Sequence, residues 1–354
     1  MISVLKRIQG SLVAAAIGDA LGMPYEIMTA KEILDVTEGK GVTGFDSIYP
    51  DRERRKIADM RDAEFGDTTD DTQLSMVVLE SLVAKCRFDL KDLAKRHSIA
   101  LQNSKFGWGT TTKVSVEELG EYFESRGKSG RRWDKPADNF KTKGTGNGVA
   151  MKVAPLALFQ FLRDEYYVYG WHQIMQLGNQ THRDVRASHA AIALAIVIKG
   201  VMSDQGYLSN ALPGKSGIGK IASLRMEMQG IERIYPPRTI EVMVSEKLKL
   251  LAKSDLFDDP IGMREQVGTG CYALESVPYS IGVAFRNPND LRTGILEAVN
   301  AGGDTDTNAA MVGAIIGANV GIDGIPEEWL SFRPEFKQIA KDAERLFIAA
   351  NSLR

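Results

Sequence analysis

The sequence has few cysteines, no excess of basic charge and no long uncharged apolar segment. Its two cysteines, Cys86 and Cys271, do not provide a disulfide framework, and both are expected in the core of a protein from a reducing compartment. The 44 basic and 46 acidic residues give a net charge of −2, so no surface for a nucleic-acid backbone is expected. No uncharged run reaches the ~18 residues of a membrane span, and the N-terminus lacks a signal-peptide pattern. These absences predict a soluble, cytoplasmic protein.

Helical periodicity dominates what the sequence does contain. Helices are expected over 3–21, 30–36, 69–86, 90–102, 149–162, 165–177, 186–202, 239–253, 272–285, 291–301, 305–320 and 335–352. Pro155 is expected to bend or interrupt its helix. Strand-like alternation is scarce, and no repeat or linker divides the chain. The prediction is an all-α protein: one compact many-helix domain over 1–354, with loop-rich insertions at 38–66, 104–147 and 203–266.

Two short acidic segments each open an unusually apolar helix. They are Thr69-Asp70-Asp71-Thr72 and Gly302-Gly303-Asp304-Thr305-Asp306-Thr307-Asn308. Carboxylates that converge repel one another, and a helix dipole offsets only ~0.3–1 kcal/mol per charge. Divalent cations between the two segments would neutralise them. The candidate ligands are all oxygen atoms, which suits Mg²⁺ or Mn²⁺: Thr69, Asp70, Asp71, Asp304, Asp306 and Thr307.

The alternative is that these residues only cap their helices, as Asp and Thr commonly do. Two segments of the same composition make metal binding the preferred hypothesis. Other metal sites fit poorly. The His and Cys spacing of a zinc site is absent, and Ala309 and Ile315 stand where an EF-hand loop requires Gly and Glu.

Glycine-rich turns precede other predicted helices. Gly144-Thr145-Gly146-Asn147-Gly148 would let backbone N–H groups approach an anion at a helix start. The segment is not a Walker loop, because no Gly-Lys-Ser/Thr follows it, and a plain turn is an equally good interpretation. His182 could donate to phosphate or ribose, whereas His189 is expected in the core. Trp108 could stack on a base or simply hold its loop, and Tyr272, after a second glycine turn, is the last candidate for a substrate contact.

Taken together, these segments resemble the ADP-ribosylglycohydrolase family, which includes dinitrogenase reductase-activating glycohydrolase and the ADP-ribosyl-acceptor hydrolases. The matching segments follow the family's order: 18–26, 69–72, 107–110, 146–156, 181–182, 275–278 and 302–307. The resemblance implies an all-α fold with a cleft that holds two divalent cations, Mg²⁺ or Mn²⁺, on the six oxygen ligands above. It also implies that the turn at 144–148 holds a diphosphate near His182. Lys152 and Arg183 depart from the family pattern, where Arg and Pro are commoner, and neither belongs to the expected metal ligands.

The activity that the resemblance implies is removal of ADP-ribose from a modified protein side chain, arginine first, by cleavage of the ribosyl C1 bond. The candidate catalytic residues are Glu26, on a mobile loop, as acid or base, with Asp70 and Asp304. Expected partners are an ADP-ribosylated protein and, as a second candidate, a cognate ADP-ribosyltransferase.

Several alternatives stay open at this point. The substrate could instead be serine- or nucleic-acid-linked ADP-ribose or a free ADP-ribosyl compound. An immunity-type protein could block a transferase by contact. A phosphohydrolase is the remaining alternative, although His97 and His172 lack the adjacent Asp that is usual there.

Overall fold

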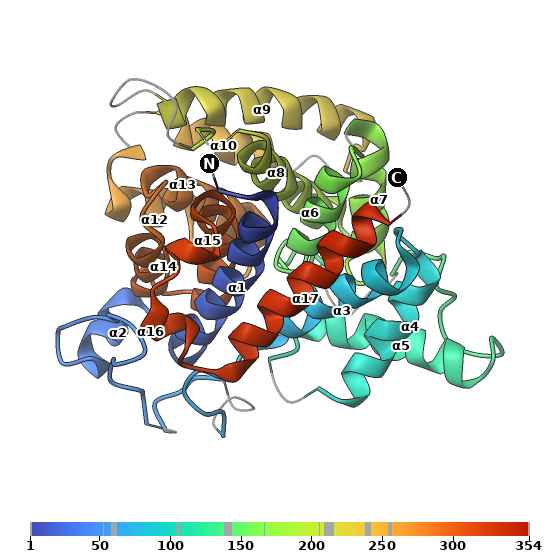
Figure 1. Cartoon of the computed structure of the whole chain (residues 1–354), viewed down its shortest axis with the longest axis horizontal. Helices are drawn as coiled ribbons and strands as arrows, with labels where there is room; N and C mark the ends of the chain where they lie inside the picture. Colours follow the sequence, from blue (N-terminus) through green and yellow to red (C-terminus); the bar gives the residue numbers. More distant parts are fainter. Residues whose placement is uncertain are drawn as a thin grey trace.

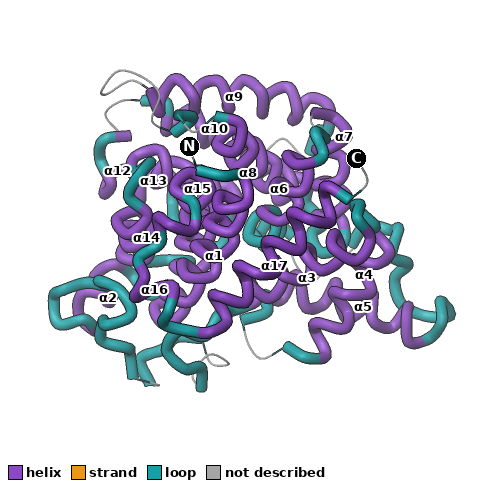
Figure 2. Tube along the Cα trace, viewed as in Figure 1, coloured by secondary structure: helices purple, strands orange, loops and turns teal. Residues whose placement is uncertain are grey.

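The fold is built from helices throughout the part of the chain that the structure describes. The computed structural model describes residues 2–51, 53–57, 62–104, 107–137, 144–165, 167–204, 206–208, 216–237, 242–253 and 257–352. Figure 2 shows helices joined by loops. Two isolated bridges, Thr29–Gly302 and Gly146–Tyr272, join loops. The prediction of an all-α domain is confirmed.

The elements in chain order have the following bounds. They are α1 (Val4–Gly22), η1 (Met23–Tyr25), α2 (Ala30–Val36), α3 (Asp70–Lys85), α4 (Leu90–Gln102), α5 (Thr110–Glu124), α6 (Ala154–Leu162), α7 (Tyr167–Asn179), α8 (Val185–Ser203), α9 (Ser216–Ile234), α10 (Val244–Leu251), α12 (Pro260–Val267), α13 (Ala273–Arg286), α14 (Leu291–Asn300), α15 (Thr305–Val320), η2 (Ile322–Gly324), α16 (Glu327–Leu330) and α17 (Pro334–Asn351).

Helices α1 and α15 form the centre of the molecule (Figure 1). Their backbones are in direct contact, because a Cβ atom on Gly18 would lie only 2.3 Å from the carbonyl oxygen of Ala309. At the end of α1, the hydroxyl of Thr305 donates to the carbonyl of Gly22 over 2.7 Å. Close packing therefore fixes the first turn of α15 against the last turn of α1.

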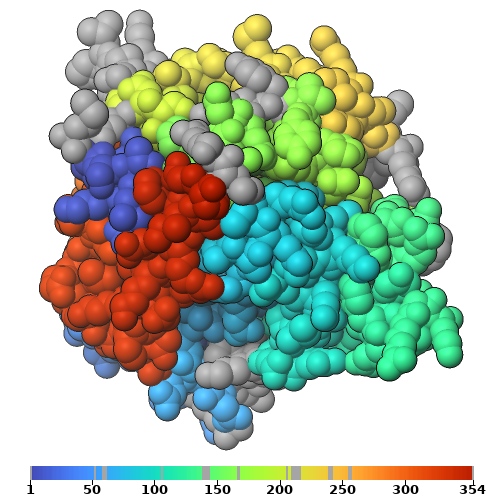
Figure 3. Space-filling view, turned by 45° about the vertical axis from the view of Figure 1, so that its right-hand side comes forward, coloured from blue at the N-terminus to red at the C-terminus, as the bar shows by residue number. Residues whose placement is uncertain are grey.

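The other helices enclose this pair. Helices α13 and α14 pack on α15, and α17 packs on both α1 and α3. Figure 3 shows the C-terminal residues in red between the blue N-terminal atoms and the cyan region of α3 and α4. Helix α8 is long and apolar enough to cross a membrane by composition, but 83% of that window is buried inside the fold. It is a core helix here.

Two of the predicted loop-rich insertions contain substantial helices. The segment 104–147 includes α5, with 15 residues, and 203–266 includes α9, with 19 residues, and most of α12, besides α10, which lies within the predicted helix 239–253. Part of the buried face of α5 consists of Thr112 and Ser115, and α9 contains Gly217, Gly219 and Gly230. Polar and glycine positions of this kind conceal the apolar period on which a sequence prediction depends.

The helix predicted over 149–162 is interrupted before Pro155 and is not bent at it. Pro155 occupies the first turn of α6, which begins at Ala154, and residues 149–152 form turns. A proline is well tolerated in a first turn because its missing N–H would have no partner within the helix. The predicted start of the helix at 239–253 falls on residues 239–241, outside the described residues, and α10 begins at Val244.

Candidate active site

A cavity of about 290 Å³ lies where the N-terminal ends of α3 and α15 meet. Both acidic segments reach it, together with the glycine turns before α5 and α6. The residues that line it are Glu26, Asp70, Asp71, Gly107, Gly109, Thr110, Thr111, Thr112, Gly146, Asn147, Gly148, Met151, His182, Cys271, Asp304, Asp306 and Thr307. Most candidate residues from the sequence therefore meet at one place, although they come from distant parts of the chain.

Asp19 of α1 organises the start of α3. Its carboxylate accepts hydrogen bonds from the N–H of Thr69 at 3.0 Å, the hydroxyl of Thr69 at 2.9 Å and the hydroxyl of Thr72 at 2.6 Å. Burial raises the pKa of Asp19 to about 6, against the opposing effect of these hydrogen bonds. The sequence analysis assigned Asp19 no role. A single acidic residue in the apolar second half of this helix is the signal that could have revealed it.

The glycine pair before α15 aims the second acidic segment into the cavity. Gly302 and Gly303 have φ angles of +74° and +85°, which favour glycine. The N–H of Gly303 donates to the carbonyl of Met28 at 2.8 Å, and the N–H of Asp304 donates to that of Thr269 at 2.8 Å. A Cβ on Gly303 would lie 2.5 Å from the Thr269 oxygen. The pair thus passes between two loops that leave no room for a side chain.

The two acidic segments meet inside the protein. Asp70, Asp71, Asp304 and Asp306 are each at most 6% exposed. The hydroxyl of Thr307 donates to Oδ2 of Asp71 over 3.2 Å and so joins the segments directly. The carboxylates that the sequence analysis expected to converge do converge, and they are buried.

This arrangement places like charges together with too few donors. Burial raises the pKa of Asp71 well above its ordinary value, and the negative charge of Asp19 raises it further. Burial and the charge of Glu26 act in the same way on Asp306. Oδ1 of Asp71 is buried and has no hydrogen-bond partner among the described residues. An orphaned carboxylate oxygen in an all-oxygen donor set is the environment that a hard divalent cation fits.

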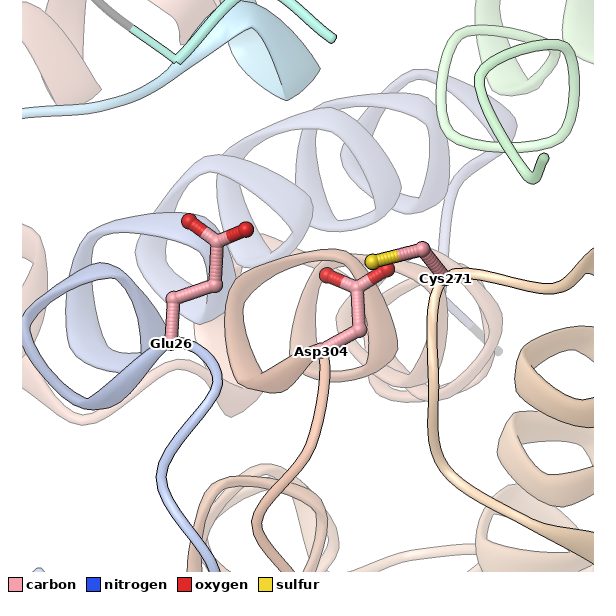
Figure 4. A group of neighbouring side chains, drawn as sticks. All are labelled: Glu26, Cys271 and Asp304. Carbon is pink, nitrogen blue, oxygen red and sulfur yellow. The ribbon is translucent and has the colours of Figure 1, made fainter. Parts of the chain in front are cut away.

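Glu26, Asp304 and Cys271 all line the cavity, and Figure 4 shows Asp304 between the other two side chains. One potential ligand atom from each lies within 4.8 Å of the other two. Cys271 is exposed, so its expected place in the core is wrong; Cys86 is partly buried at the end of α3. The turn that carries Cys271 pairs through its backbone with the glycine turn at 146–147, at the cavity that both turns line. The negative charge of Asp304 and then burial raise the pKa of the Cys271 thiol.

The glycine turn at 144–148 also supports the carboxylates. The N–H of Asn147 donates to the carbonyl of Cys271 at 3.0 Å, and its side-chain amide donates to Oδ2 of Asp304 at 2.7 Å. Asn147 therefore orients a cavity carboxylate, a role that differs from the predicted contact with an anion. Gly146 and Gly148 line the cavity, whereas Gly144 and Thr145 are not among the residues that line it.

His182 lies at the cavity with a buried lysine behind it. Burial, and then the positive charge of Lys152, lower the pKa of His182 to about 3, so its ring is neutral. Burial also lowers the pKa of Lys152 to about 7, although the negative charge of Asp70 opposes this effect. The sequence analysis noted Lys152 only as a departure from the family pattern and gave it no role.

Trp108 and Tyr272 are not among the residues that line the cavity. The indole N–H of Trp108 donates to Oε1 of Gln73 on α3 at 3.2 Å, so the ring is held on the flank of that helix. The hydroxyl of Tyr272 accepts from Arg186 at 3.3 Å. The position of neither side chain supports the predicted substrate contact. The glycines on either side of Trp108 reach the cavity instead.

Fold and site together define an all-helical enzyme with buried carboxylates that face a cavity. The chain belongs to the ADP-ribosylglycohydrolase family, whose model matches residues 2–353. It is therefore a hydrolase of glycosyl bonds that removes ADP-ribose from substrates carrying it. The family is generally metal-dependent, and the acidic cavity is the candidate metal site.

Named relatives agree with this assignment. Human ADP-ribosylhydrolase ARH3 is 29% identical, over 92% of this chain and 88% of its own length. The ADP-ribosylarginine hydrolase Tri1 of Pseudomonas putida (strain GB-1) is 24% identical, over 97% of this chain and 78% of its own length. A solved structure described as an ADP-ribosylglycohydrolase-related protein complex is 21% identical, with a TM-score of 0.67 over 98% of this chain and 99% of its own, and shows the same fold.

Proposed function

We propose that this enzyme releases ADP-ribose from modified arginine side chains and that it does so with two divalent cations, Mg²⁺ or Mn²⁺, in the carboxylate cavity. The observation that carries the metal proposal is the meeting of both acidic segments around the orphaned Oδ1 of Asp71. The arginine preference rests on the likeness to a relative named as an ADP-ribosylarginine hydrolase. Serine-linked ADP-ribose is the second candidate substrate.

The residues that would hold the cations are those that the sequence predicted, all of them in or beside the cavity: Thr69, Asp70, Asp71, Asp304, Asp306 and Thr307. When bound, such cations orient sugar hydroxyls and lower the pKa of a bound water molecule. The chain contributes the geometry, since Asp19 holds Thr69 in place and Asn147 holds Asp304.

The protein side chains would divide the remaining work as follows. The diphosphate would lie in the cavity against Gly146, Gly148 and His182, which line it together. Glu26, next to Asp304, would remove a proton from the attacking water or give one to the leaving nitrogen. An ionised Asp70 would stabilise the positive charge that develops at ribosyl C1. The modified side chain would enter beside the exposed Cys271 and the partly buried Glu26.

Substitution of the second acidic segment tests this proposal. Asp304→Asn and Asp306→Asn should each lower release of ADP-ribose from ADP-ribosylarginine by about a hundredfold or more, because outer-shell changes alone cost 10–100-fold. The helical circular-dichroism signal should not change. Asp290→Asn, at the cap of α14, is the matched control and should keep full activity, since Asn caps a helix as well as Asp does. A folded Asp304→Asn enzyme with full activity would refute the proposal.

A substrate panel separates the remaining alternatives. Arginine-, serine- and nucleic-acid-linked ADP-ribose should be compared with Mg²⁺ and with Mn²⁺. Faster release from serine than from arginine would overturn the arginine preference and leave the metal proposal intact. An immunity-type protein that blocks a transferase only by contact would keep that effect in Asp304→Asn, whereas an enzyme would lose its protection.

A further inference from the structure

Three polar side chains form a buried row beside the cavity. Lys152 and Thr181 are completely buried, and His182 is 3% exposed. Nζ of Lys152 lies 3.2 Å from Oγ1 of Thr181. The same Oγ1 lies 2.9 Å from Nδ1 of His182. The row therefore leads from a buried cation, through one hydroxyl, to the imidazole at the cavity.

The donors and acceptors available on these groups determine which atom donates in each hydrogen bond of the row. A charged lysine has donors and no acceptor, so the Thr181 oxygen accepts from Lys152. The single hydroxyl hydrogen of Thr181 is then left for Nδ1 of His182. Since the pKa of His182 is lowered to about 3, the ring is neutral and carries one N–H. Nδ1 accepts, and the ring hydrogen must lie on Nε2.

The far nitrogen of the ring faces the glycine turn of the cavity. A Cβ on Gly148 would lie 3.1 Å from Nε2 of His182, and one on Gly146 would lie 3.7 Å from it. Both glycines and His182 line the cavity. The ring therefore packs closely on Gly148, with Cε1 only 2.8 Å from such a Cβ, and an N–H at Nε2 would lie at the cavity wall beside this backbone.

We propose that Lys152 and Thr181 are positioning residues, which hold His182 as the Nε2–H tautomer so that it donates a hydrogen bond to a phosphate oxygen of ADP-ribose. The opposite tautomer would aim a lone pair at an anionic oxygen and would repel it. The identity of the acceptor rests on the proposed function, whereas the tautomer does not.

The tautomer is measured directly by nuclear magnetic resonance of the ligand-free protein with ¹⁵N-labelled histidine. The chain has 4 histidines, so the ring signals are few, and His182→Gln assigns the relevant pair by its disappearance. In the unsubstituted protein, the ring of His182 should be neutral, with the hydrogen on Nε2 alone. A His182 signal with the hydrogen on Nδ1 would overturn the proposal, and only the assignment variant His182→Gln has to fold for this test.

Variants of the row then test its effect on binding, measured by calorimetry with ADP-ribose at saturating Mg²⁺. Thr181→Val and Lys152→Met should mix the tautomers of His182 and weaken ADP-ribose binding by about tenfold, the usual loss for one hydrogen bond to a charged group. Thr181→Ser and Lys152→Arg keep the donors and should restore both readouts. Lys199→Met, which removes another buried lysine far along the fold, should change neither.

Two results separate this inference from the proposed function. If Thr181→Val keeps both the tautomer and the affinity of the unsubstituted protein, the row does not position His182 and the inference is wrong. If the unsubstituted protein fails to bind ADP-ribose at all, the proposed function fails, while the tautomer of the ligand-free protein still decides whether the row directs His182.

Discussion

The two ends of helix α15 hold buried charges in opposite ways. Near its C-terminal end lies Arg7, which is 3% exposed. The guanidinium donates to the carbonyl oxygens of Ala318 at 2.7 Å and Met202 at 3.1 Å, and also to that of Val201. These carbonyls belong to the last turns of α15 and α8, where the helix dipoles favour a cation. The chain alone satisfies this charge.

The N-terminal end of the same helix holds the opposite charge and does not satisfy it. The dipole favours Asp304 and Asp306 there, but the first turn of α3 brings Asp70 and Asp71 to the same place. Oδ1 of Asp71 has no partner within the described part of the chain. A buried charge that the fold completes is structural. A buried charge that lacks partners within the fold marks a place where the protein binds another group.

The largest expected effect on stability is at the C-terminal end of α15, where the chain alone satisfies the charge of Arg7. Arg7→Met should lower the free energy of unfolding by about 3–5 kcal/mol, because it leaves buried carbonyl groups without donors. Urea unfolding in metal-free buffer measures this change. Arg345→Met is the control: Arg345 pairs with Glu80 and Asp342 at the surface and should cost no more than about 1 kcal/mol. Equal losses for the two variants would remove the distinction between the ends of α15.

A substitution at the N-terminal end of α15, where the fold leaves the buried charge incomplete, should instead raise the free energy of unfolding. Because burial and neighbouring charges raise the pKa of Asp71, its ionised form destabilises the metal-free fold. Asp71→Asn should therefore raise metal-free stability by about 1–2 kcal/mol and abolish activity, as is common for functional sites. Mg²⁺ at a hundredfold its Kd should stabilise the unsubstituted protein by about 2.7 kcal/mol for each cation bound. It should not stabilise Asp71→Asn.

Thermal unfolding with and without EDTA measures both effects. Asp290→Asn should keep the metal response of the unsubstituted protein, since its carboxylate lies at the cap of α14. A destabilised metal-free Asp71→Asn protein would show that the carboxylate is satisfied within the chain, as Arg7 is.

The same contrast explains which features the sequence could predict. The bounds of α2, α4 and α15 agree with the prediction because they depend on local signals. Thr29 and Asp89 cap the first two, and Gly321, at a φ of +70°, ends the third. The acidic segments of the site were equally visible, since each is a short run at a helix start.

What the sequence could not reveal depends on contacts between distant segments. Asp19 supports Thr69 across 50 residues, and Lys152 reaches Thr181 across 29. Neither pair has a spacing that local periodicity records. Cys271 is exposed and lies in a turn that pairs with the distant turn at 146–147, a contact that the sequence around it does not indicate. Support for a site is therefore harder to predict than the site's own charged residues.

The smallest expected effect concerns Lys199, which lies near the C-terminal end of α8. Lys199 is 5% exposed and donates to Oε1 of Gln160 at 3.3 Å. Burial lowers its pKa from 10.5 to about 8. Between these values the unfolded chain binds more protons than the folded one, so stability should rise with pH. The cost of burying the charge is complete below pH 8 and fades above it.

Urea unfolding of the unsubstituted protein and of Lys199→Met, at pH 8 and at about pH 9.5, measures the free-energy cost of burying the charge of Lys199. The difference between the two proteins should change by about 2 kcal/mol in favour of the unsubstituted protein as pH rises, since one pKa unit corresponds to about 1.4 kcal/mol. Lys341→Met, at an exposed position, should show no such change. A pH-independent difference for Lys199→Met would mean that Gln160 and its neighbours solvate the ammonium group as fully as carbonyl oxygens hold Arg7.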